Sequence, residues 1–555
     1  MKQRMGWTIA IVAIAIVFVA ATLSIGFVTG TGDFWRLLQG DVADAQIGWF
    51  YYARDVWQFP VFYVGNYHQP EGSYVTLSDS LPLLAFAFKC LFKTFYAPGS
   101  DPPIYAGIWC AICFFLQVVA GSRLLFSLGI RQPLQHLAAL VLLCYAPILF
   151  FRFGQFGLLA HFFILLSLDS YVRATRTPPL PLNWWLLCSL PVVAVLLHPY
   201  IAAMSTIFLI ATVIECFRIG TIDARGLVLR VCGTAASAIG LMLLGGGYLT
   251  AASQNFADYG MYSLNLASPF VPFPSTLLGR ALGTNTPSIS GIYQWEGGCY
   301  LGAGVLSLCL ACAPVMRDLS VRLKKHRALI VLLVLAITYA ISNRIGFGSH
   351  ELLTIPLPAK LVGLLSIFRG SGRFAWAVVY TLTVFLVTVV VRGYSPRASI
   401  AVLAGAAVLQ FIDVAPMQWD VRAATTQTSQ PTVSVATWSE LIKKHTKVFE
   451  FPSFECGGIY DADVPGGRWR ALEIDWLIAK SGLPNNSAYL TRYTKDCDRE
   501  RALAVADHER GTLYLYRSTE DIGAFLSRMG AISPACGYLD DVVVCSPGMD
   551  LSSLK

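Results

Sequence analysis

Long apolar runs separated by short polar connections fill the first 416 residues of the chain. A helix needs about 20 apolar residues to cross the hydrocarbon core of a bilayer. The runs that approach this length predict eleven membrane-spanning helices. We expect them at residues 7–28, 104–122, 135–151, 156–172, 184–197, 200–217, 228–250, 298–316, 328–343, 373–391 and 398–416.

The first run follows Lys2 and Arg4, as the apolar part of a signal peptide would. The run is long, however, and no small-residue cleavage motif follows it. We therefore expect a retained first span whose amino end lies in the cytoplasm.

A further apolar stretch, residues 81–97, carries Lys89 and Lys93 one helical turn apart near its middle. A charge at the centre of a bilayer costs roughly 3 kcal/mol on insertion scales. Two lysines on one face are better accommodated by a helix that lies in the interface. We expect such an interfacial helix on the outer surface.

Basic residues fix the direction of insertion. With 81–97 outside the bilayer, the short basic connections, including the cluster at 317–327, all fall on one side. The positive-inside rule makes that side the cytoplasm. If 81–97 crossed the membrane, all these charges would face outward. The segments expected to face outward are the long loops 30–103, 251–297 and 344–372, the short turn 151–155, and the tail after 416.

Composition agrees with a membrane protein. Hydrophobic residues make up 55% of the 555 residues and charged residues only 13%. This excludes a single soluble enzyme, which needs more charge to cover its surface.

The net charge of +8 is explained by topology, so nucleic acid is not an expected partner. The chain has no P-loop, HExxH motif or nucleophile elbow, which leaves an ATP-driven pump without support.

The pattern changes after Pro416. The alternating runs VFEF (448–451) and LYLY (513–516) predict strands, and the segments at 469–482 and 521–530 predict helices. We expect two domains: residues 1–416 in the membrane and residues 417–555 as a small periplasmic α/β domain.

Ten of the 14 cysteines lie in or beside predicted spans, where a thiol is usually an apolar filler. The other four are Cys456, Cys497, Cys536 and Cys545. Cys536 and Cys545 flank a short strand pattern and are expected to pair, which leaves Cys456 for Cys497. Four free thiols in a cytosolic domain is the alternative, and the predicted topology disfavours it.

The first outer loop contains the strongest candidates for chemistry. Asp41 and Asp44 are three residues apart, so they share a face if this segment is helical. Two neighbouring carboxylates can divide the work: one takes a proton from a hydroxyl, and the other holds a sugar hydroxyl or a divalent cation. Alternatively, these acids are only surface groups of an interfacial loop.

The segments GDVADAQIGWFYYARDVWQFP, GSYVTLSDSLPLLAFAFK, YQWEGGCYLG and FRGSGRFAWAVVY resemble an uncharacterised bacterial membrane-protein family. Its long first outer loop and interfacial helix resemble those of the GT-C superfamily of integral membrane glycosyltransferases. In that superfamily an acidic residue early in this loop is the catalytic base or a metal ligand. The resemblance implies this role for Asp41, with Asp44 next. A DxD or DE pair is absent here, since Val42 and Ala43 separate the two.

Arg369 and Arg373 form a second constellation, four residues apart at the outer end of a span. If both lie on one helical face, their guanidinium groups would bind the phosphate of a lipid-linked sugar. Free backbone amides at the helix start, near Gly370 to Gly372, would add hydrogen bonds to this phosphate. The alternative is a pair of arginines that snorkel to the lipid headgroups.

Other polar residues of the outer loops are candidate ligands for a sugar or acceptor. Asp79 is also expected to cap the interfacial helix. A lone histidine beside a proline, such as His198, is more often a hydrogen-bonded group at a helix end than a ligand or a base. The candidates are Tyr293, Gln294, Trp295, Glu296, Asp79, His68 and His198.

The apolar runs predict an all-α membrane bundle, and the resemblance implies that the bundle is of GT-C type and lies in the bacterial inner membrane. The expected reaction transfers a sugar from a polyprenyl-phosphate carrier to a glycan, lipid or protein acceptor, with inversion. No cofactor is certain, and a divalent cation stays open. The alternatives are a transporter or assembly factor for envelope glycans, and a scaffold that binds lipid-linked sugar without turnover.

Overall fold

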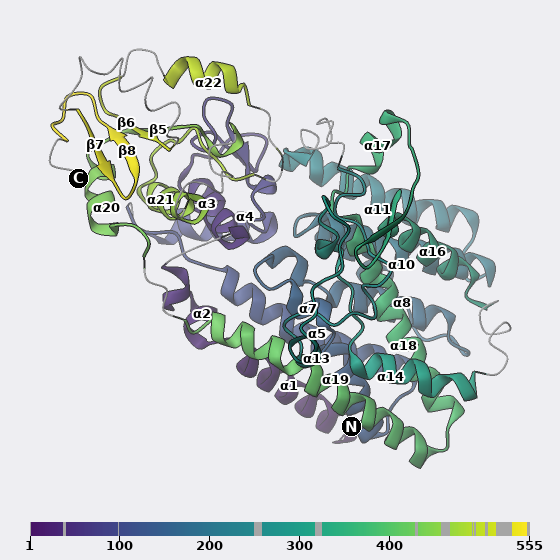
Figure 1. The fold of residues 1–555 in the computed structure, drawn as a ribbon. Helices are drawn as coiled ribbons and strands as arrows, with labels where there is room; N and C mark the ends of the chain where they lie inside the picture. The colour runs from purple at the N-terminus through teal and green to yellow at the C-terminus, as the bar shows by residue number, and fades with distance from the viewer. Residues whose placement is uncertain are drawn as a thin grey trace. The chain divides into compact units, whose positions relative to one another are not determined.

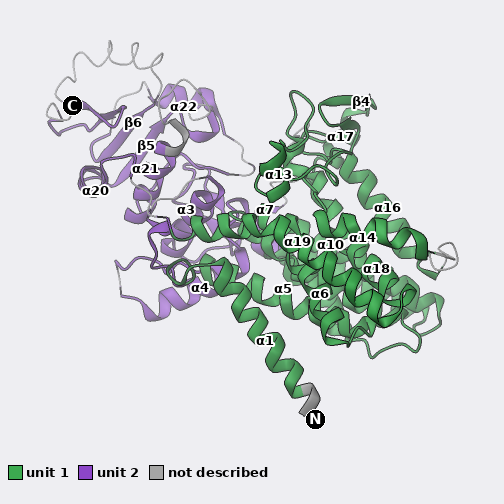
Figure 2. Ribbon diagram, turned by 60° about the horizontal axis from the view of Figure 1, so that its bottom comes forward, with its two compact units in different colours: residues 1–28, 106–241, 255–426 green, residues 29–105, 242–254, 427–555 purple. Residues whose placement is uncertain are grey.

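The computed structural model describes residues 2–36, 40–97, 99–248, 258–316, 325–427, 431–456, 467–490, 492, 495–504, 509–517 and 535–551. The helix expected at 521–530 and most of the basic cluster at 317–327 lie outside these residues. The chain forms two compact units (Figures 1 and 2). Unit 1 holds residues 1–28, 106–241 and 255–426, and unit 2 holds 29–105, 242–254 and 427–555.

Apolar helices build unit 1. Among the described residues, eight helical segments are long and apolar enough to cross a membrane, and three apolar helices are shorter. Together they match the eleven expected spans one by one. The eight are Met5–Thr22, Ala106–Leu128, Pro133–Phe151, Phe156–Thr175, Pro199–Arg218, Ala224–Gly245, Ser371–Gly393 and Pro396–Ala424. The three are Trp184–Val195, Ala303–Val315 and Arg327–Ile341.

Several spans are composed of more than one element. The labelled helices are α1 (Lys2–Thr22), α2 (Ile25–Thr29), α5 (Ala106–Leu128), α6 (Pro133–Cys144), α7 (Pro147–Phe151), α8 (Phe162–Thr175), α9 (Trp184–Val195), α10 (Pro199–Arg218), α11 (Ala224–Gly245), α13 (Leu277–Leu282), α14 (Ala303–Cys312), α16 (Arg327–Ile341), α17 (Ala359–Leu365), α18 (Ala375–Gly393) and α19 (Pro396–Ala424). Short 3-10 turns are η3 (Phe156–Leu159), η4 (Gln294–Gly297), η5 (Ala313–Val315) and η6 (Ser371–Phe374). The hairpin β3 (Arg344–Phe347) with β4 (His350–Thr354) precedes α17.

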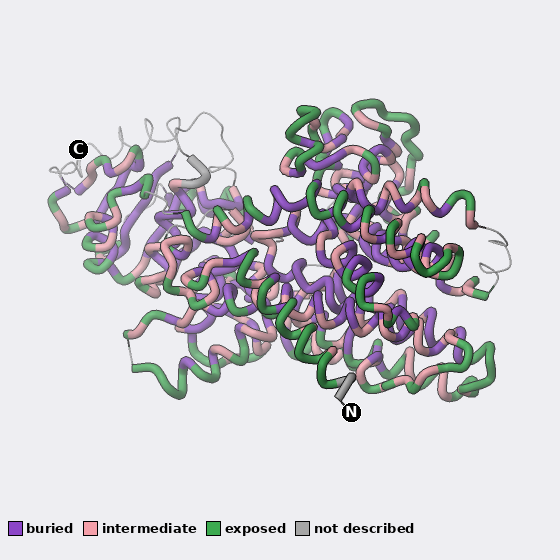
Figure 3. Tube along the Cα trace, turned by 90° about the horizontal axis from the view of Figure 1, so that it is seen from below, coloured by how far each residue is buried: buried purple, intermediate pink, exposed green. Residues whose placement is uncertain are grey.

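Burial differs among the spans of unit 1 (Figure 3). Buried residues make up 83% of the apolar window of Phe156–Thr175 but only 6% of that of Ala224–Gly245. An apolar helix with so little protein contact is suited to face lipid. In contrast, the buried Asp169 of α8 is bonded to Arg123 and Arg173 at 2.7 and 2.9 Å.

Unit 2 contains the first outer loop together with the tail. The loop forms η1 (Asp33–Trp35), α3 (Gly40–Arg54), β1 (Tyr63–Val64), β2 (Ser73–Tyr74), η2 (Val75–Leu77) and α4 (Pro82–Phe95). The tail forms α20 (Val435–Lys443), β5 (Lys447–Phe451), η7 (Phe454–Cys456), α21 (Gly467–Ser481), α22 (Cys497–Ala504), β6 (Thr512–Tyr516), β7 (Cys536–Leu539) and β8 (Val542–Cys545). The strands β5 and β6 and the helix α21, expected at 469–482, confirm the sequence prediction.

Helix α4 corresponds to the stretch 81–97 and is too short to count among the candidate spans. Phe86, Leu91 and Phe95 are exposed on it, as suits an interfacial helix. Lys89, expected on a charged stripe, is instead buried. Its ammonium lies over the rings of Tyr52 and Trp57, 4.0 and 4.5 Å from their centroids, and these cation–π contacts offset part of its desolvation.

The tail folds around a four-stranded sheet of order β5-β6-β8-β7. Strands β5 and β6 are parallel, whereas β8 is antiparallel to both β6 and β7. Trp438 of α20 and Ile474 of α21 are buried in one core with Val448, Leu513 and Val544 of the strands. This is the small α/β fold that the alternating runs predict.

Both expected disulfides are present. Cys456 is bonded to Cys497, and Cys536 to Cys545. The first bond joins η7 to the start of α22, and the second joins the paired strands β7 and β8.

The first outer loop packs on the tail within unit 2. The ring of Phe50 meets that of Trp476 at 4.5 Å, and the Tyr51 hydroxyl donates to the carbonyl of Leu483 at 3.1 Å. Unit 2 therefore contains the first outer loop as well as the tail, because aromatic side chains of α3 pack against α21. The expected division at residue 416 assigned this loop to the membrane domain. Helix α19 also continues through Pro416 to Ala424.

Candidate functional site

Three carboxyl groups gather in the first outer loop: Asp41, Asp44 and Asp79, named here the acidic cluster. Helix α3 begins at Gly40 and carries Asp41 and Asp44 one turn apart. The segment is thus helical, which is the condition under which the sequence places the two aspartates on one face. Asp44 is buried with 3% exposure, and its Oδ1 has no hydrogen-bond partner. Asp41 is half-buried.

Gly48 explains how Asp79 comes near α3. A Cβ at Gly48 would lie 2.0 Å from Ser78 Oγ, so only glycine lets the segment 78–80 lie against the helix one turn after Asp44. The Ser80 hydroxyl then donates to the carbonyl of Ala45 at 2.7 Å. This packing holds Asp79 within electrostatic reach of Asp44.

Asp79 does not have the helix-capping role that we expected. Leu81 occupies the N-cap of α4 in a left-handed conformation, and no side chain caps the helix. Pro82 at the first position lacks an N–H, which removes one of the donors that a cap would satisfy.

The acidic cluster disfavours ionisation of its buried member. Burial raises the pKa of Asp44 well above its ordinary value, and the negative charges of Asp79 and Asp41 raise it further. A buried carboxyl that is harder to ionise, beside two that are more exposed, can provide a hydrogen-bond donor next to acceptors.

His68 lies elsewhere in unit 2, in the loop between β1 and β2. It is buried with 3% exposure, and its Nδ1 lies 3.1 Å from the carbonyl of Gly72. Its Nε2 lies 3.4 Å from Oε1 of Glu455. A carbonyl only accepts, so Nδ1 carries the proton and Nε2 faces Glu455 as an acceptor.

A second group of polar residues lies in unit 1, where Arg152, Glu296 and Arg373 form what we name the arginine cluster. Arg152 Nη1 lies 2.7 Å from Glu296 Oε2, and Arg373 Nη2 lies 3.1 Å from the same oxygen. The three side chains are 3%, 15% and 13% exposed. Burial opposes ionisation of Glu296, but the two guanidinium groups outweigh it and lower the pKa of Glu296 to about 2.

Two glycines bring the arginine cluster together. A Cβ at Gly372 would lie 2.5 Å from the Cα of Gly297, so the turns η4 and η6 touch only because both residues lack a side chain. Glu296 and Arg373 are the neighbours of these glycines in sequence. The glycines of the segment 370–372 thus allow the backbone of η6 to pack closely on η4.

Arg369 and Arg373 do not share a helical face, in contrast to the prediction. Arg373 is part of the 3-10 turn η6, which Arg369 precedes. The backbone amides expected to be free are also used: Gly370 N–H donates to the Tyr200 hydroxyl, and Gly372 N–H donates to the carbonyl of Tyr262 at 3.1 Å.

Arg369 makes its own contacts at the edge of the cluster. Its guanidinium donates to the Tyr262 hydroxyl, lies over that ring, and is 3.6 Å from Asp258. Tyr293 stacks on Tyr262 with ring centroids 5.5 Å apart. Tyr293 and Trp295 are 48% and 44% exposed, so both aromatic faces can be reached from outside.

Two other candidates have structural partners. Gln294 is completely buried, and its amide is bonded to Asn265 and Ser263 at 2.8 and 3.0 Å. It therefore holds the loop rather than a ligand. His198 caps α10, with its Nδ1 accepting from Tyr200 N–H at 3.3 Å. Burial, then Arg373 and Arg152, lower the pKa of His198, so it stays neutral.

Arg152 was not among the residues predicted from the sequence. In the predicted topology this arginine stands alone in the short outer connection 151–155, where the positive-inside rule expects few basic residues, and this was the available signal. An arginine that departs from that rule has a local reason to be there. In unit 1 this reason is Glu296.

No set of three or more histidine, cysteine or acidic side chains is arranged to hold a metal ion in the described part of the chain. The acidic cluster contributes only oxygen ligands, which suit magnesium or calcium rather than zinc.

These features define a multi-pass helical membrane protein with a small α/β domain at its carboxyl end. The chain belongs to the DUF6311 family, whose description is "Domain of unknown function" and whose model matches residues 12–415. The model of the DUF6311 C-terminal domain matches residues 437–547. The expectation of a family without an assigned reaction is thereby confirmed.

Comparison with curated proteins finds no match. Among solved structures, the chain is similar to that of ArnT from Cupriavidus metallidurans in the apo state. The two share 12% sequence identity over 98% of each chain, with a TM-score of 0.41.

Proposed function

We propose that this protein is an integral membrane glycosyltransferase that uses a polyprenyl-phosphate-linked sugar. The observation that carries the proposal is the acidic cluster, where the buried Asp44 lies beside Asp41 and Asp79. A transferase needs one group that takes the proton of the acceptor hydroxyl and another that fixes a sugar hydroxyl. The resemblance of the first outer loop to the GT-C superfamily supports the same reading.

In the proposed reaction Asp41 takes the proton of an acceptor hydroxyl. The hydroxyl oxygen attacks the anomeric carbon, and the bond from that carbon to the phosphate oxygen breaks. The phosphate leaves with the electron pair. Direct displacement inverts the anomeric centre. The protonated Asp44 donates a hydrogen bond to a hydroxyl of the sugar or acceptor.

The arginine cluster is the proposed binding site for the phosphate. Arg152, Arg369 and Arg373 bring three permanent positive charges, and Glu296 holds two of them in place. Guanidinium groups bind phosphate with paired hydrogen bonds and keep their charge at every physiological pH.

We further propose that the site faces the periplasm of the bacterial inner membrane, where nucleotide sugars are absent. The two disulfides of the tail support this, since such bonds persist outside the reducing cytosol. The acceptor would be a glycan, lipid or protein of the cell envelope.

A panel of polyprenyl-phosphate sugars in proteoliposomes tests the proposal. We expect one donor to be consumed, and we expect Arg373→Gln to raise the donor KM by about tenfold, which corresponds to 1.4 kcal/mol. Arg344→Gln is the matched control, because Arg344 pairs with Glu351 outside the cluster. Donors that bind without any turnover would instead define a scaffold, and no binding at all would favour an assembly factor.

A further inference from the structure

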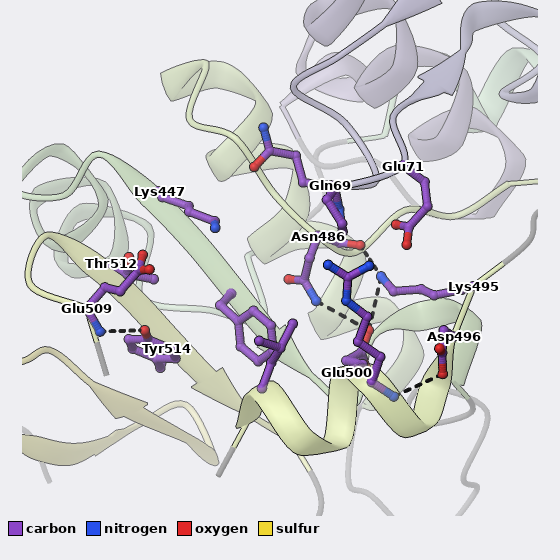
Figure 4. A pocket seen from close by; sticks show the side chains of 14 residues that line it. Gln69, Glu71, Lys447, Asn486, Lys495, Asp496, Glu500, Glu509, Thr512 and Tyr514 are labelled. Carbon is purple, nitrogen blue, oxygen red and sulfur yellow. Dashed lines mark hydrogen bonds and ion pairs between the residues drawn. The ribbon is translucent and has the colours of Figure 1, made fainter. Parts of the chain in front are cut away.

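Unit 2 contains a pocket of about 230 Å³ between the first outer loop and the C-terminal domain (Figure 4). Gln69 and Glu71 of the loop form one wall. Lys447 of β5 and Thr512 of β6 form another, and Arg499 of α22 a third. Residues far apart in sequence thus meet around one small space, and the acidic cluster has no member among them.

The floor of the pocket is fixed by buried polar contacts. Lys495 Nζ lies 3.0 Å from Glu500 Oε2, and Glu500 Oε1 accepts from the backbone N–H of Ser453 at 2.7 Å. Asn486 donates to the carbonyl of Glu450 at 2.9 Å. The disulfide that starts at Cys497 ties this region of α22 to η7. The floor is therefore pre-organised for a ligand.

The charges around the pocket are of mixed sign. Four carboxylates and three cations line it, which gives a net charge of −1. They are Glu71, Asp496, Glu500 and Glu509, and Lys447, Lys495 and Arg499. A phosphate would meet the repulsion of the acidic groups. A ligand rich in hydroxyl groups fits better, because each hydroxyl both donates and accepts a hydrogen bond.

The pocket also has an apolar side. Phe449 and Tyr514 lie on the neighbouring strands β5 and β6 with ring centroids 5.7 Å apart, and Leu503 of α22 adds an aliphatic side chain. Aromatic rings offer a flat apolar surface for the C–H face of a sugar. Pockets for drug-sized ligands measure about 300 Å³ or more, so this smaller space suits a single sugar ring.

One short segment connects the pocket with the acidic cluster. Tyr67 stacks on Tyr51 with ring centroids 4.7 Å apart, and Tyr51 lies two turns after Asp44 on α3. Gln69 and Glu71, which line the pocket, follow Tyr67 directly in the chain. A ligand in the pocket therefore lies at the far end of a segment that is anchored beside the acidic cluster.

We propose that this pocket binds one uncharged sugar unit of the acceptor glycan and so selects the acceptor. The role in acceptor choice rests on the proposed transferase function, whereas the binding of sugar does not depend on it.

The test uses the full chain in lipid nanodiscs. Saturation-transfer NMR measures binding of the methyl glycosides of glucose, galactose, mannose and N-acetylglucosamine. We expect millimolar binding of at least one glycoside, weakened about tenfold by Arg499→Ala and by Leu503→Trp, which fills the pocket. Arg501→Ala is the matched control, because Arg501 is exposed on the same helix and does not line the pocket.

Absence of binding for all four glycosides would overturn the proposal, and so would binding that ignores both pocket variants. Binding of inorganic phosphate at the pocket would also overturn it, since that would define an anion site. If sugar binds as expected but no donor is ever consumed, the transferase proposal fails while the sugar site stands. If transfer occurs and the pocket variants leave the acceptor KM unchanged, the role in acceptor choice fails alone.

Discussion

Arg152 Nη1 lies 2.7 Å from Glu296 Oε2, although 144 residues separate the two in sequence. The pair joins the end of α7 to the turn η4, and Arg373 of η6 completes it. Three connections between apolar helices are thereby fixed by one carboxylate. Because this carboxylate is largely buried, its loss would leave two guanidinium groups in a site of low dielectric constant.

The first prediction concerns this pair. We expect Arg152→Gln to lower the free energy of unfolding by about 3 kcal/mol, because it breaks a buried ion pair. Thermal unfolding of the purified protein in detergent measures the change. The control is Arg344→Gln, which breaks a more exposed pair and is expected to cost less than about 1 kcal/mol. Equal losses in the two variants would show that Arg152 has no special role.

The second prediction concerns Gly48. We expect Gly48→Ala to destabilise the protein by about 1–3 kcal/mol and to slow sugar transfer, because the added Cβ collides with Ser78 and displaces Asp79. Gly405→Ala is the matched control, since a Cβ there meets nothing within 4 Å and alanine favours a helix. If Gly48→Ala were as stable and active as the parent chain, the packing of Asp79 against α3 would not matter.

The third prediction concerns Glu455 and His68. Burial raises the pKa of Glu455 to about 8, despite the opposing charge of Lys495, and burial lowers the pKa of His68 to about 4. Between pH 4.5 and 8 the folded state keeps a proton on Glu455 that the unfolded chain releases, so stability falls as pH rises through this range. His68 acts in the opposite sense below pH 6.5, where only the unfolded chain binds its proton.

The window from pH 6.5 to 8 lies above the range in which His68 acts and includes Glu455. We expect the unfolding temperature to fall across this window, with a smaller fall in Glu455→Gln, because Asp44 also has a raised pKa and acts in the same sense. Glu440→Gln, at an exposed residue of α20, is expected to leave the slope unchanged. An unchanged slope in Glu455→Gln would assign the effect to another group.

The fourth prediction concerns the disulfides. The bond between Cys456 and Cys497 closes a loop of 41 residues, and that between Cys536 and Cys545 a loop of 9. Loop-closure entropy gives about 4 kcal/mol for the first and about 2.5 kcal/mol for the second. We expect the serine pair at 456 and 497 to be the less stable of the two double variants, by denaturant unfolding. Mass spectrometry without reductant that found free thiols at these four positions would also contradict the proposed periplasmic tail.

The length of the apolar runs was sufficient to predict the spanning helices, because burial in lipid depends on length and composition more than on specific contacts. The shared face of Asp41 and Asp44 could be predicted only on the condition that their segment is helical, because it depends on their spacing alone. Arg152 was missed because its partner Glu296 lies far away in sequence. The environment predicted for Lys89 was wrong, because only the tertiary fold brings the rings of Tyr52 and Trp57 next to its ammonium.

If Asp41 takes the proton of the acceptor hydroxyl, single-turnover sugar transfer depends on its carboxylate. Proteoliposomes loaded with the donor found in the panel would receive acceptor, and the transferred sugar would be followed over time in wild type, Asp41→Asn and the neighbouring control Asp33→Asn. We expect Asp41→Asn to bind donor but to transfer the sugar at least about 100-fold more slowly, while Asp33→Asn transfers at the wild-type rate. Transfer by Asp41→Asn at the wild-type rate would contradict this role of Asp41.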